Sequence, residues 1–372
     1  MDAVELAAWL RLLETPTVGR TSARRLLGGC GSAVAVFEAA PAAWESLAGP
    51  AVAAALAKPP ADFDALLTRT EAWLDGGTND EPRSLLCLGD PAYPSALLNT
   101  ADPPLLLYLQ GQPSCLGQEL LAIVGSRHPT PQGVQTARAL SGELARHGLV
   151  IVSGLALGID GAAHEAALET GGSSIAVVGT GLDRVYPARH RGLAHRLAQR
   201  GLLISEFPLG TPPLANNFPQ RNRIIAGLTR GTLVVESALK SGSLITARLA
   251  AEAGRDVYAV PGAIQSLQSQ GCHLLIKQGA KLVESAADVL EELQWPGRLP
   301  VSGAADLAVP GSAGTAHADL LAALGHGPVT FDALSDRTGR SSQDLGAALL
   351  ELELAGQIAR LPGQLFQRIG LG

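Results

Sequence analysis

Short apolar runs alternate with amphipathic stretches through the middle of the chain, from about residue 84 to 296. The runs are rich in Val, Ile and Leu, and most of them continue into Gly, Ser or Glu: LAIVGS, LVIVSG, SIAVVGTG, LLISEF, TLVVES, DVYAVPG and AKLVES. Apolar strands between helices are typical of a parallel sheet that helices cover on both faces. The pattern predicts an α/β fold with an extended Rossmann-like, doubly wound, mostly parallel sheet, whose functional crevice lies at the carboxyl edge.

The first 80 residues show a different pattern, that of short helices. Within them, TPTVGRTSARRLLGGCGSAVAVFEA predicts a helix with Arg24 and Arg25 between two Gly-containing turns. One interpretation is a helix-hairpin-helix or SAM-like unit, whose turn offers backbone N–H groups to a phosphate. The other is a plain helical packing module.

The tail contains three helical patterns, HADLLAALG, FDALSDRTG and SQDLGAALLELELAG, followed by QIARLPGQLFQRI, which predicts two short strands. This order is typical of a winged-helix domain, whose third helix normally reads DNA. Here that helix carries Asp344, Glu351 and Glu353 and no Lys or Arg, so protein contact or packing is favoured over DNA reading. We therefore divide the chain into a helical domain (1–80), a Rossmann-like domain (81–297), a linker (298–316) and a winged-helix domain (317–372).

Composition excludes several classes of protein. With 372 residues, 47% hydrophobic and 17% charged, the chain can bury a sizeable core and is too apolar for general disorder. No apolar run approaches the roughly 18 residues of a membrane span, and the acidic N-terminus lacks a signal-peptide pattern. The four cysteines form no CxxC pair, which argues against a zinc site or a disulfide framework. We expect a cytoplasmic protein without metal or cofactor.

The net charge of −6 is distributed unevenly. Residues 181–255 hold 11 Lys and Arg against 4 Asp and Glu, a local balance of 11 − 4 = +7. Such a segment either attracts a polyanion locally or reflects charges scattered over solvated helix faces.

Two predicted strand-to-helix junctions carry a cation beside small residues. VGSRHPTPQG places Gly125, Ser126 and Arg127 after the first parallel strand, and Arg127 is either an anion ligand or a helix-surface arginine. The glycine pattern is not GxGxxG and the next strand ends without an acid, so NAD binding is not expected. ALKSGSLITARL places Lys240, Ser241, Gly242 and Ser243 at a helix start, which suits an oxyanion and is compatible with Ser243 capping the helix.

A third junction, NNFPQRNRIIAGLTRG, delivers Phe218, Arg221, Asn222 and Arg223 into the start of a predicted helix. Cations at the positive end of a helix are repelled by its dipole unless an anion binds there. Phe218 either stacks on a nucleic-acid base or pins the loop. A doubly wound fold brings such junctions together at the carboxyl edge of its sheet. We therefore expect Arg127, Arg221, Arg223 and Lys240 on one rim of the crevice there.

One further pair, Asp160 and His164 in SGLALGIDGAAHEAAL, lies four residues apart on one predicted helix face. It could serve acid–base catalysis or form a helix cap with a satisfied histidine. We favour the structural role because no nucleophile or metal-ligand pattern accompanies the pair.

The motifs resemble those of the DNA-processing protein A (DprA, also called Smf) family, in the family's order between about residues 90 and 290. They are DPAYP, DPPLLLYLQG, IVGSRHPTPQG, VSGLALGIDGAAHEAAL, VVGTGLDRVYPARHRGLA, LLISEFPLGTPP, NFPQRNRIIAGL, VVESALKSGSLITARLA and GRDVYAVPG. The resemblance implies a non-catalytic single-stranded DNA (ssDNA) binding protein. It also implies a homodimer that protects incoming ssDNA and loads RecA recombinase onto it during natural transformation and homologous recombination, displacing or bypassing single-strand binding protein.

The resemblance also implies which residues bind. Carried over by motif, the basic pocket falls on Arg127, Phe218, Arg221, Arg223 and Lys240. QSQGCHLLIKQGA departs from the family, because Cys272 and His273 occupy a turn that more often carries Asn. The apolar residues that follow are either a dimer face or core: Leu274, Leu275 and Ile276.

Two other functions remain as alternatives. RGTLVVE resembles part of the GGxGTxxE pattern of lysine-decarboxylase-like Rossmann hydrolases, which would make the chain a nucleotide phosphoribohydrolase with Glu236 as acid–base residue. Thr229 and Arg230 stand where that pattern has glycine, so we expect no enzyme. A winged-helix transcription factor is disfavoured by the acidic third helix.

Overall fold

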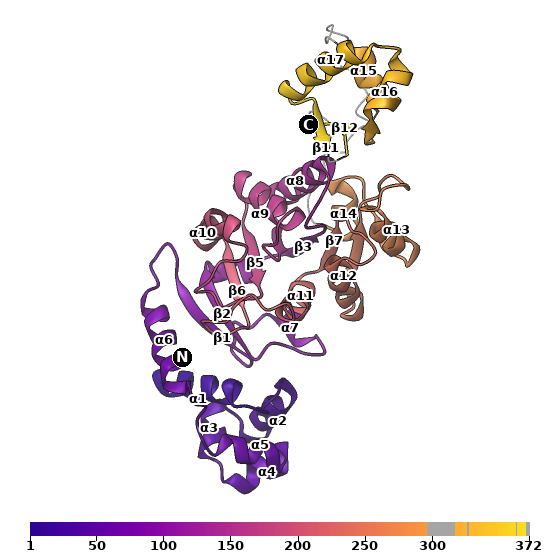
Figure 1. Cartoon of the computed structure of the whole chain (residues 1–372). Helices are drawn as coiled ribbons and strands as arrows, with labels where there is room; N and C mark the ends of the chain where they lie inside the picture. Colours follow the sequence, from indigo (N-terminus) through magenta and orange to yellow (C-terminus); the bar gives the residue numbers. More distant parts are fainter. Residues whose placement is uncertain (296–316, 326, 362, 370–372) are drawn as a thin grey trace.

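The computed structural model describes residues 1–295, 317–325, 327–361 and 363–369. Helices at the N-terminus form one end of the molecule, an α/β part forms the middle, and a small helical part with short strands forms the other end (Figure 1). The linker expected at 298–316 lies outside the described residues.

The N-terminal part consists of helices around a core that includes Trp9, Leu12, Leu26 and Leu56. Their bounds are α1 Ala3–Glu14, α2 Arg20–Cys30, α3 Ala33–Glu38, α4 Pro41–Ala48, α5 Pro50–Leu56 and α6 Phe63–Asp75. The same core continues onto Leu106 and Tyr108 of the sheet, so apolar packing joins the helical part to the middle of the molecule.

The middle of the molecule is a nine-stranded sheet with the order β1-β2-β6-β5-β4-β3-β7-β8-β9. The strands are β1 Arg83–Cys87, β2 Leu106–Gly111, β3 Leu120–Val124, β4 Val150–Ser153, β5 Ser174–Val178, β6 Leu202–Ser205, β7 Gly231–Val234, β8 Asp256–Ala259 and β9 Lys281–Leu282. Strands β3 to β9 pair in parallel, as the apolar runs predict. The sequence pattern missed β1 and β2, which extend the sheet by antiparallel pairing onto β6.

Helices cover both faces of this sheet. Leu120, Ala122 and Val124 of β3 face one core, while Leu121 and Ile123 face the other, because neighbouring side chains of a strand alternate. The helices and 3-10 turns of this part are α7 Ser95–Leu98, η1 Pro113–Gly117, α8 Pro131–Arg146, α9 Ile159–Glu169, η2 Ala188–His190, α10 Arg191–Arg200, α11 Asn217–Leu228, α12 Gly242–Glu252, α13 Gln270–Lys277 and α14 Ala286–Glu292. The expected doubly wound fold is confirmed.

The chain reverses direction at β3. It runs outward from β3 through β4 and β5 to β6, and then returns to the opposite side of β3 to form β7. The connections that leave β3 and β7 therefore diverge at the carboxyl edge, which opens a crevice between them.

The C-terminal part has the predicted helices α15 Ala318–Leu324, α16 Phe331–Thr338 and α17 Ser342–Leu354, followed by β11 Ile358–Leu361 and β12 Leu365–Arg368. A strand that the sequence pattern missed, β10 Val329–Thr330, completes a sheet with the order β10-β12-β11. This part has its own core, and the Gln367 side chain donates to Gln132 Oε1 of α8 at 2.8 Å. The winged-helix architecture is confirmed.

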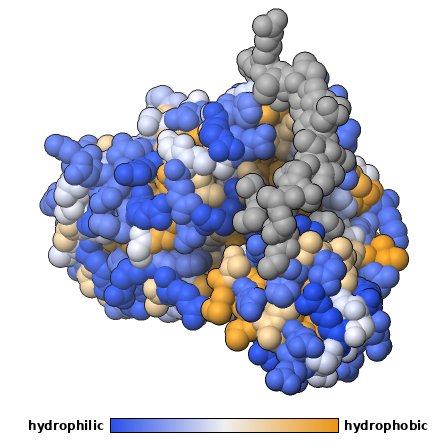
Figure 2. Space-filling view, turned by 90° about the horizontal axis from the view of Figure 1, so that it is seen from above, coloured by the Kyte–Doolittle hydropathy of each residue, from blue (hydrophilic) through white to orange (hydrophobic). Residues whose placement is uncertain are grey.

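Seen from above, the surface is mainly hydrophilic, and the hydrophobic residues form separate patches (Figure 2). Within the described ranges, no helix has the length and apolarity that a membrane crossing needs. Nor do the described His, Cys, Asp and Glu side chains gather into a group that could hold a metal ion.

Candidate nucleic-acid interface

The crevice between the β3 and β7 connections is a cavity of about 740 Å³. Its lining comes mainly from the loop after β3, the first turns of α11, and the loop that joins β7 to α12, with further residues from the segments after β4 and β5. All the binding residues expected from the sequence line it, apart from Arg223: Gly125, Ser126, Arg127, Phe218, Arg221, Asn222, Lys240, Ser241, Gly242 and Ser243. Segments more than a hundred residues apart in sequence, such as those of Gly125 and Ser243, thus meet at the point where the order of the strands reverses.

Three cationic side chains line this cavity. Arg127 and Lys240 are exposed at its rim, whereas Arg221 is buried. No carboxylate in the described part of the chain forms an ion pair with any of the three. Asp160, the acid among the lining residues, is buried and accepts hydrogen bonds from the Gly154 and Ala156 N–H groups. A concave site with unpaired cations at its rim attracts an anion.

Arg221 is part of the floor of the cavity. It lies in the second turn of α11, which begins at Asn217, and this corrects the expectation that Arg221 sits at the helix start. Its guanidinium donates to Gly154 O at 2.5 Å, to Val177 O, and to Asn222 Oδ1 at 2.9 Å. Burial lowers the pKa of Arg221 to about 10. The cation is held in place by the backbone at the ends of β4 and β5.

Hydroxyl groups and a helix N-terminus form the β7 side of the cavity. Ser241 caps α12 by accepting from the Ser243 N–H at 3.3 Å, so the cap is Ser241 and not Ser243. The Ser243 hydroxyl lies 2.7 Å from that of Ser241 and 2.9 Å from that of Ser237. Hydroxyls and free N–H groups at the start of a helix suit a phosphate oxygen.

Aromatic rings form the opposite side. Phe218 is half-buried, and its ring centroid lies 5.6 Å from that of Tyr186. The Arg127 guanidinium carbon lies 5.6 Å from the Phe218 centroid, within the range of a cation–π contact. Tyr186, which is 49% exposed, was missed in the sequence, although its place in the loop after a parallel strand assigns it to the carboxyl edge.

The comparison with protein families decides the identity. A model of the family described as DNA recombination-mediator protein A matches residues 84–294, more than half of the chain. The chain belongs to the DprA family. Models of the DprA-like N-terminal HHH domain and of the DprA winged-helix domain match residues 4–58 and 305–364. The sequence resemblance and the kinds of terminal domain are thereby confirmed.

Individual DprA relatives agree with this assignment. Protein Smf of Escherichia coli is 47% identical over 281 residues, which cover 73% of this chain and 74% of that protein. The X-ray structure of DprA from Streptococcus pneumoniae is 38% identical with a TM-score of 0.65, and the match covers 78% of this chain and 98% of that one. A structure of DprA from Helicobacter pylori, described for its unique single-stranded DNA binding mode, is 33% identical with a TM-score of 0.52, covering 57% of this chain and 95% of that one.

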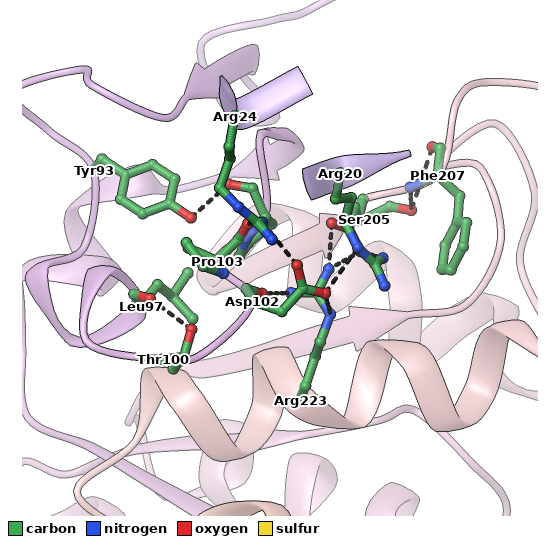
Figure 3. A network of polar contacts seen from close by, with 12 residues as sticks. Arg20, Arg24, Tyr93, Leu97, Thr100, Asp102, Pro103, Ser205, Phe207 and Arg223 are labelled. Atoms are coloured by element: carbon green, nitrogen blue, oxygen red, sulfur yellow. Dashed lines mark hydrogen bonds and ion pairs between the residues drawn. The ribbon is translucent and has the colours of Figure 1, made fainter. Parts of the chain in front are cut away.

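Arg223 lies apart from the DprA cavity, which corrects the expectation that it joins the rim. Its side chain pairs with both carboxylate oxygens of Glu206, and its Nη1 donates to Asp102 O at 2.5 Å. Arg20 and Arg24 of α2 also bind the Asp102 carboxylate, at 2.8 and 2.7 Å (Figure 3). Because α11 turns by about 100° per residue, residues two positions apart face opposite ways. Arg223 therefore binds the N-terminal helices to the sheet.

The proposed dimer residues divide between core and surface. Leu275 is buried and Ile276 packs against the same core, whereas Leu274 is 37% exposed. Leu274 and Leu239, which is 54% exposed, line a second groove of about 740 Å³ between α12 and α13. Of the three positions expected at a dimer face, Leu274 and Leu275 line this groove, and Leu274 is the exposed one.

Asp160 and His164 are fully engaged inside the fold. His164 Nδ1 lies 2.7 Å from Ser174 Oγ, and its Nε2 accepts from the Leu155 N–H at 3.3 Å. Burial lowers the pKa of His164 to about 3. These contacts hold the loop after β4 and leave His164 in a structural position.

Glu236 lies outside this cavity and lines a separate one of about 260 Å³. Its carboxylate accepts from the Thr130 N–H at 2.8 Å and the Thr130 hydroxyl at 2.6 Å, at the N-terminus of α8. A Cβ at Gly133 would overlap the Glu236 carboxyl group, so only glycine permits this approach. Burial raises the pKa of Glu236. The carboxylate binds Thr130, the N-cap residue of α8, and is not among the residues that line the cavity described above.

Proposed function

We propose that the chain binds single-stranded DNA in the cavity at the carboxyl edge of the sheet, with little sequence preference. The observation that carries the proposal is the convergence of Arg127, Arg221 and Lys240, without ion-pair partners among the described residues, beside the Phe218–Tyr186 rings. Family membership and the single-stranded DNA binding mode described for Helicobacter pylori DprA support it.

Each part of the lining suits one part of a nucleotide. The cations and the N-terminus of α12 offer charge and N–H donors to phosphate oxygens, which every nucleotide carries. An aromatic ring beside them offers a stacking surface to a base of any kind. A duplex hides its base faces, so the arrangement favours a single strand.

The test is fluorescence anisotropy on an oligothymidine at several salt concentrations, for wild type and Arg127→Ala/Lys240→Ala. We expect the double variant to bind about 10- to 100-fold more weakly, with a salt slope reduced by about 1.4, or 0.7 per lost phosphate contact. Arg138→Ala/Arg248→Ala is the matched control, because both of those arginines already pair with glutamates. Equal affinity of wild type and Arg127→Ala/Lys240→Ala would refute the pocket assignment.

We further propose that the chain protects incoming ssDNA and loads RecA recombinase onto it during natural transformation and recombination, bypassing single-strand binding protein. Family membership supports this step. On ssDNA covered with single-strand binding protein, the chain should shorten the lag before RecA hydrolyses ATP. A lag unchanged by wild type would contradict loading, whatever the affinity for DNA.

A homodimer and the absence of catalysis complete the proposal. The groove between α12 and α13, with Leu239 and Leu274 exposed in it, supports a self-association face. The engagement of Glu236 at the start of α8 argues against its use as an acid–base group. Release of adenine from AMP, abolished by Glu236→Gln, would overturn the non-catalytic assignment.

A further inference from the structure

The segment that follows β5 is strongly basic, and only Tyr186 of it lines the cavity. Residues 179–201 contain five arginines and a single acid, Asp183. Asp183 lies 3.9 Å from Arg184 and already accepts a hydrogen bond from the Gly210 N–H at 2.8 Å. The other four form no ion pair with any described residue: Arg189, Arg191, Arg196 and Arg200.

Arg184, Arg189 and Arg191 lie at the same edge of the sheet as the cavity. The loop leaves the carboxyl end of β5, Tyr186 contacts Phe218 inside the cavity, and α10 starts at Arg191 beside α9 (Figure 1). Arg184, Arg189 and Arg191 are therefore within five residues of a lining residue. A helix rises 1.5 Å per residue, so Arg196 and Arg200 lie about 8 and 14 Å further along α10, away from this edge.

The loop is held in place before any ligand binds. The Arg184 N–H donates to Gly181 O at 3.1 Å, and the Thr180 hydroxyl donates to Arg184 O at 3.3 Å. At its far end, the His190 N–H donates to Pro187 O at 2.9 Å and the His190 ring contacts Leu155 O at 3.0 Å. Arginines on an ordered loop lose less entropy on binding than arginines on an unstructured one.

We propose that Arg184, Arg189 and Arg191 form a second phosphate-binding tract that continues the single strand beyond the cavity. The strand enters beside Lys240 at β7, passes Arg127 at β3, stacks at Phe218 and Tyr186, and leaves over the β5–α10 loop. The tract deepens the DNA-binding function proposed above and rests on it. Its ligand is the sugar–phosphate backbone of nucleotides outside the cavity, because the exposed arginines contact phosphate. The ring of His190 between them is packed against Leu155 O and Gly161.

The tract makes binding depend on strand length. The test measures the affinity for oligothymidines of about 6 and about 20 nucleotides, for wild type, Arg189→Ala/Arg191→Ala and Arg196→Ala/Arg200→Ala. Each variant removes two charges from the same segment, so they are matched in charge. Arg189→Ala/Arg191→Ala should lose about tenfold on the long strand, with a salt slope reduced by about 1.4, and should bind the short strand as wild type does. Arg196→Ala/Arg200→Ala should resemble wild type on both.

The outcomes separate the tract from the cavity. If Arg127→Ala/Lys240→Ala loses binding at both lengths while Arg189→Ala/Arg191→Ala loses none on the long strand, the tract is wrong and the cavity stands. If Arg189→Ala/Arg191→Ala and Arg196→Ala/Arg200→Ala weaken long-strand binding equally, the overall charge of the segment and not a defined binding tract is responsible, and the tract is again wrong. If wild type binds neither oligonucleotide, the proposed function itself fails.

Discussion

Arg221 and Arg127 line the same cavity, but Arg221 is buried and Arg127 is exposed. Substitution should therefore affect stability at Arg221 and leave it nearly unchanged at Arg127. Arg221 is 4% exposed and satisfies Gly154 O and Val177 O, which would be left buried without a donor in Arg221→Met. We expect that variant to lose about 2–4 kcal/mol of unfolding free energy, measured by urea denaturation. Arg127→Met, at an exposed position, should stay within about 0.5 kcal/mol of wild type. Equal stability of the two variants would contradict the structural part assigned to Arg221.

Phe218 has neighbours on several sides, so its ring can pin the loop and stack a base at once. Phe218→Leu keeps apolar volume against Tyr186 and Gly179 but removes the flat ring. If the ring stacks, the affinity for a short oligothymidine should fall by about 1–3 kcal/mol in anisotropy titrations, with little change in melting temperature. Phe218→Tyr is the control that retains the ring. A fall in melting temperature with unchanged affinity would mean that Phe218 only holds the loop.

His164 predicts a pH-dependent contribution to stability. The Ser174 hydroxyl donates to Ile151 O, so it accepts from His164 Nδ1–H, and Nε2 accepts from the Leu155 N–H. The folded ring is therefore neutral, and burial lowers its pKa to about 3, against about 6.5 in the unfolded chain. Between these values the unfolded state binds the additional proton, so the unfolding free energy falls as the pH drops, by at most about 1.4 kcal/mol per unit.

The measurement for His164 is a comparison of wild type with His164→Gln between pH 7 and 4. Burial raises the pKa of Asp160, which acts with the opposite sign, so only the difference between the two proteins isolates His164. The stability advantage of wild type over the variant should shrink as the pH falls. An advantage that is constant across this range would contradict a buried neutral histidine.

At the scale of elements, apolar periodicity predicted the parallel strands and the helices between them, because a strand buried on both faces leaves a continuous apolar run. It missed β1 and β2, because antiparallel strands are not joined by the helical crossovers whose sequence pattern marks the parallel strands. The expectation that strand-to-helix junctions meet at the carboxyl edge of the sheet correctly placed the residues that line the cavity. It failed for Arg223 because direction around a helix depends on where the helix begins, and α11 begins four residues before Arg221.

For α13 and α17, too, the sequence did not predict which side of the helix is exposed. Three consecutive apolar residues on a helix cannot all face a partner, and of the three in α13 only Leu274 is exposed. On α17 the acidic residues suggested protein contact or packing, and the structure leaves Leu350 and Leu354 exposed at 56% and 81%. Sequence alone could not separate the exposed from the buried leucines there.

Among the described residues, Asp102 makes two of the three ion pairs that join α2 to the middle of the molecule, and Glu206 makes the third. Asp102 pairs with Arg20, Arg24 and Arg223 (Figure 3). In Asp102→Asn, Glu206 would be the one carboxylate left in this cluster of three arginines. We expect a loss of about 1–3 kcal/mol in the urea unfolding of the full chain, with unchanged affinity for ssDNA. Asp64→Asn, at an exposed position with no ion pair among the described residues, is the control. Weaker DNA binding by Asp102→Asn would show that the N-terminal helices act on the cavity.

At the scale of the whole molecule, net charge and local charge differ. A chain with a net charge of −6 places Arg127, Arg221 and Lys240 together in one cavity, whereas Arg223 nearby in sequence is neutralised by Glu206. Net charge alone would have argued against nucleic acid. The field at the site depends instead on which cations lack a carboxylate nearby, and this is a property of the fold.

We expect the chain to self-associate through the α12–α13 groove. Leu239 and Leu274 are exposed there, and a glutamate at each position would bring two charges into an apolar contact between copies. We expect wild type to sediment as a dimer and Leu239→Glu/Leu274→Glu as a monomer in analytical ultracentrifugation. Leu98→Glu, on an equally exposed leucine of α7 outside the groove, should remain a dimer. If Leu239→Glu/Leu274→Glu stays dimeric, the interface lies elsewhere; if wild type is monomeric, the dimer is wrong.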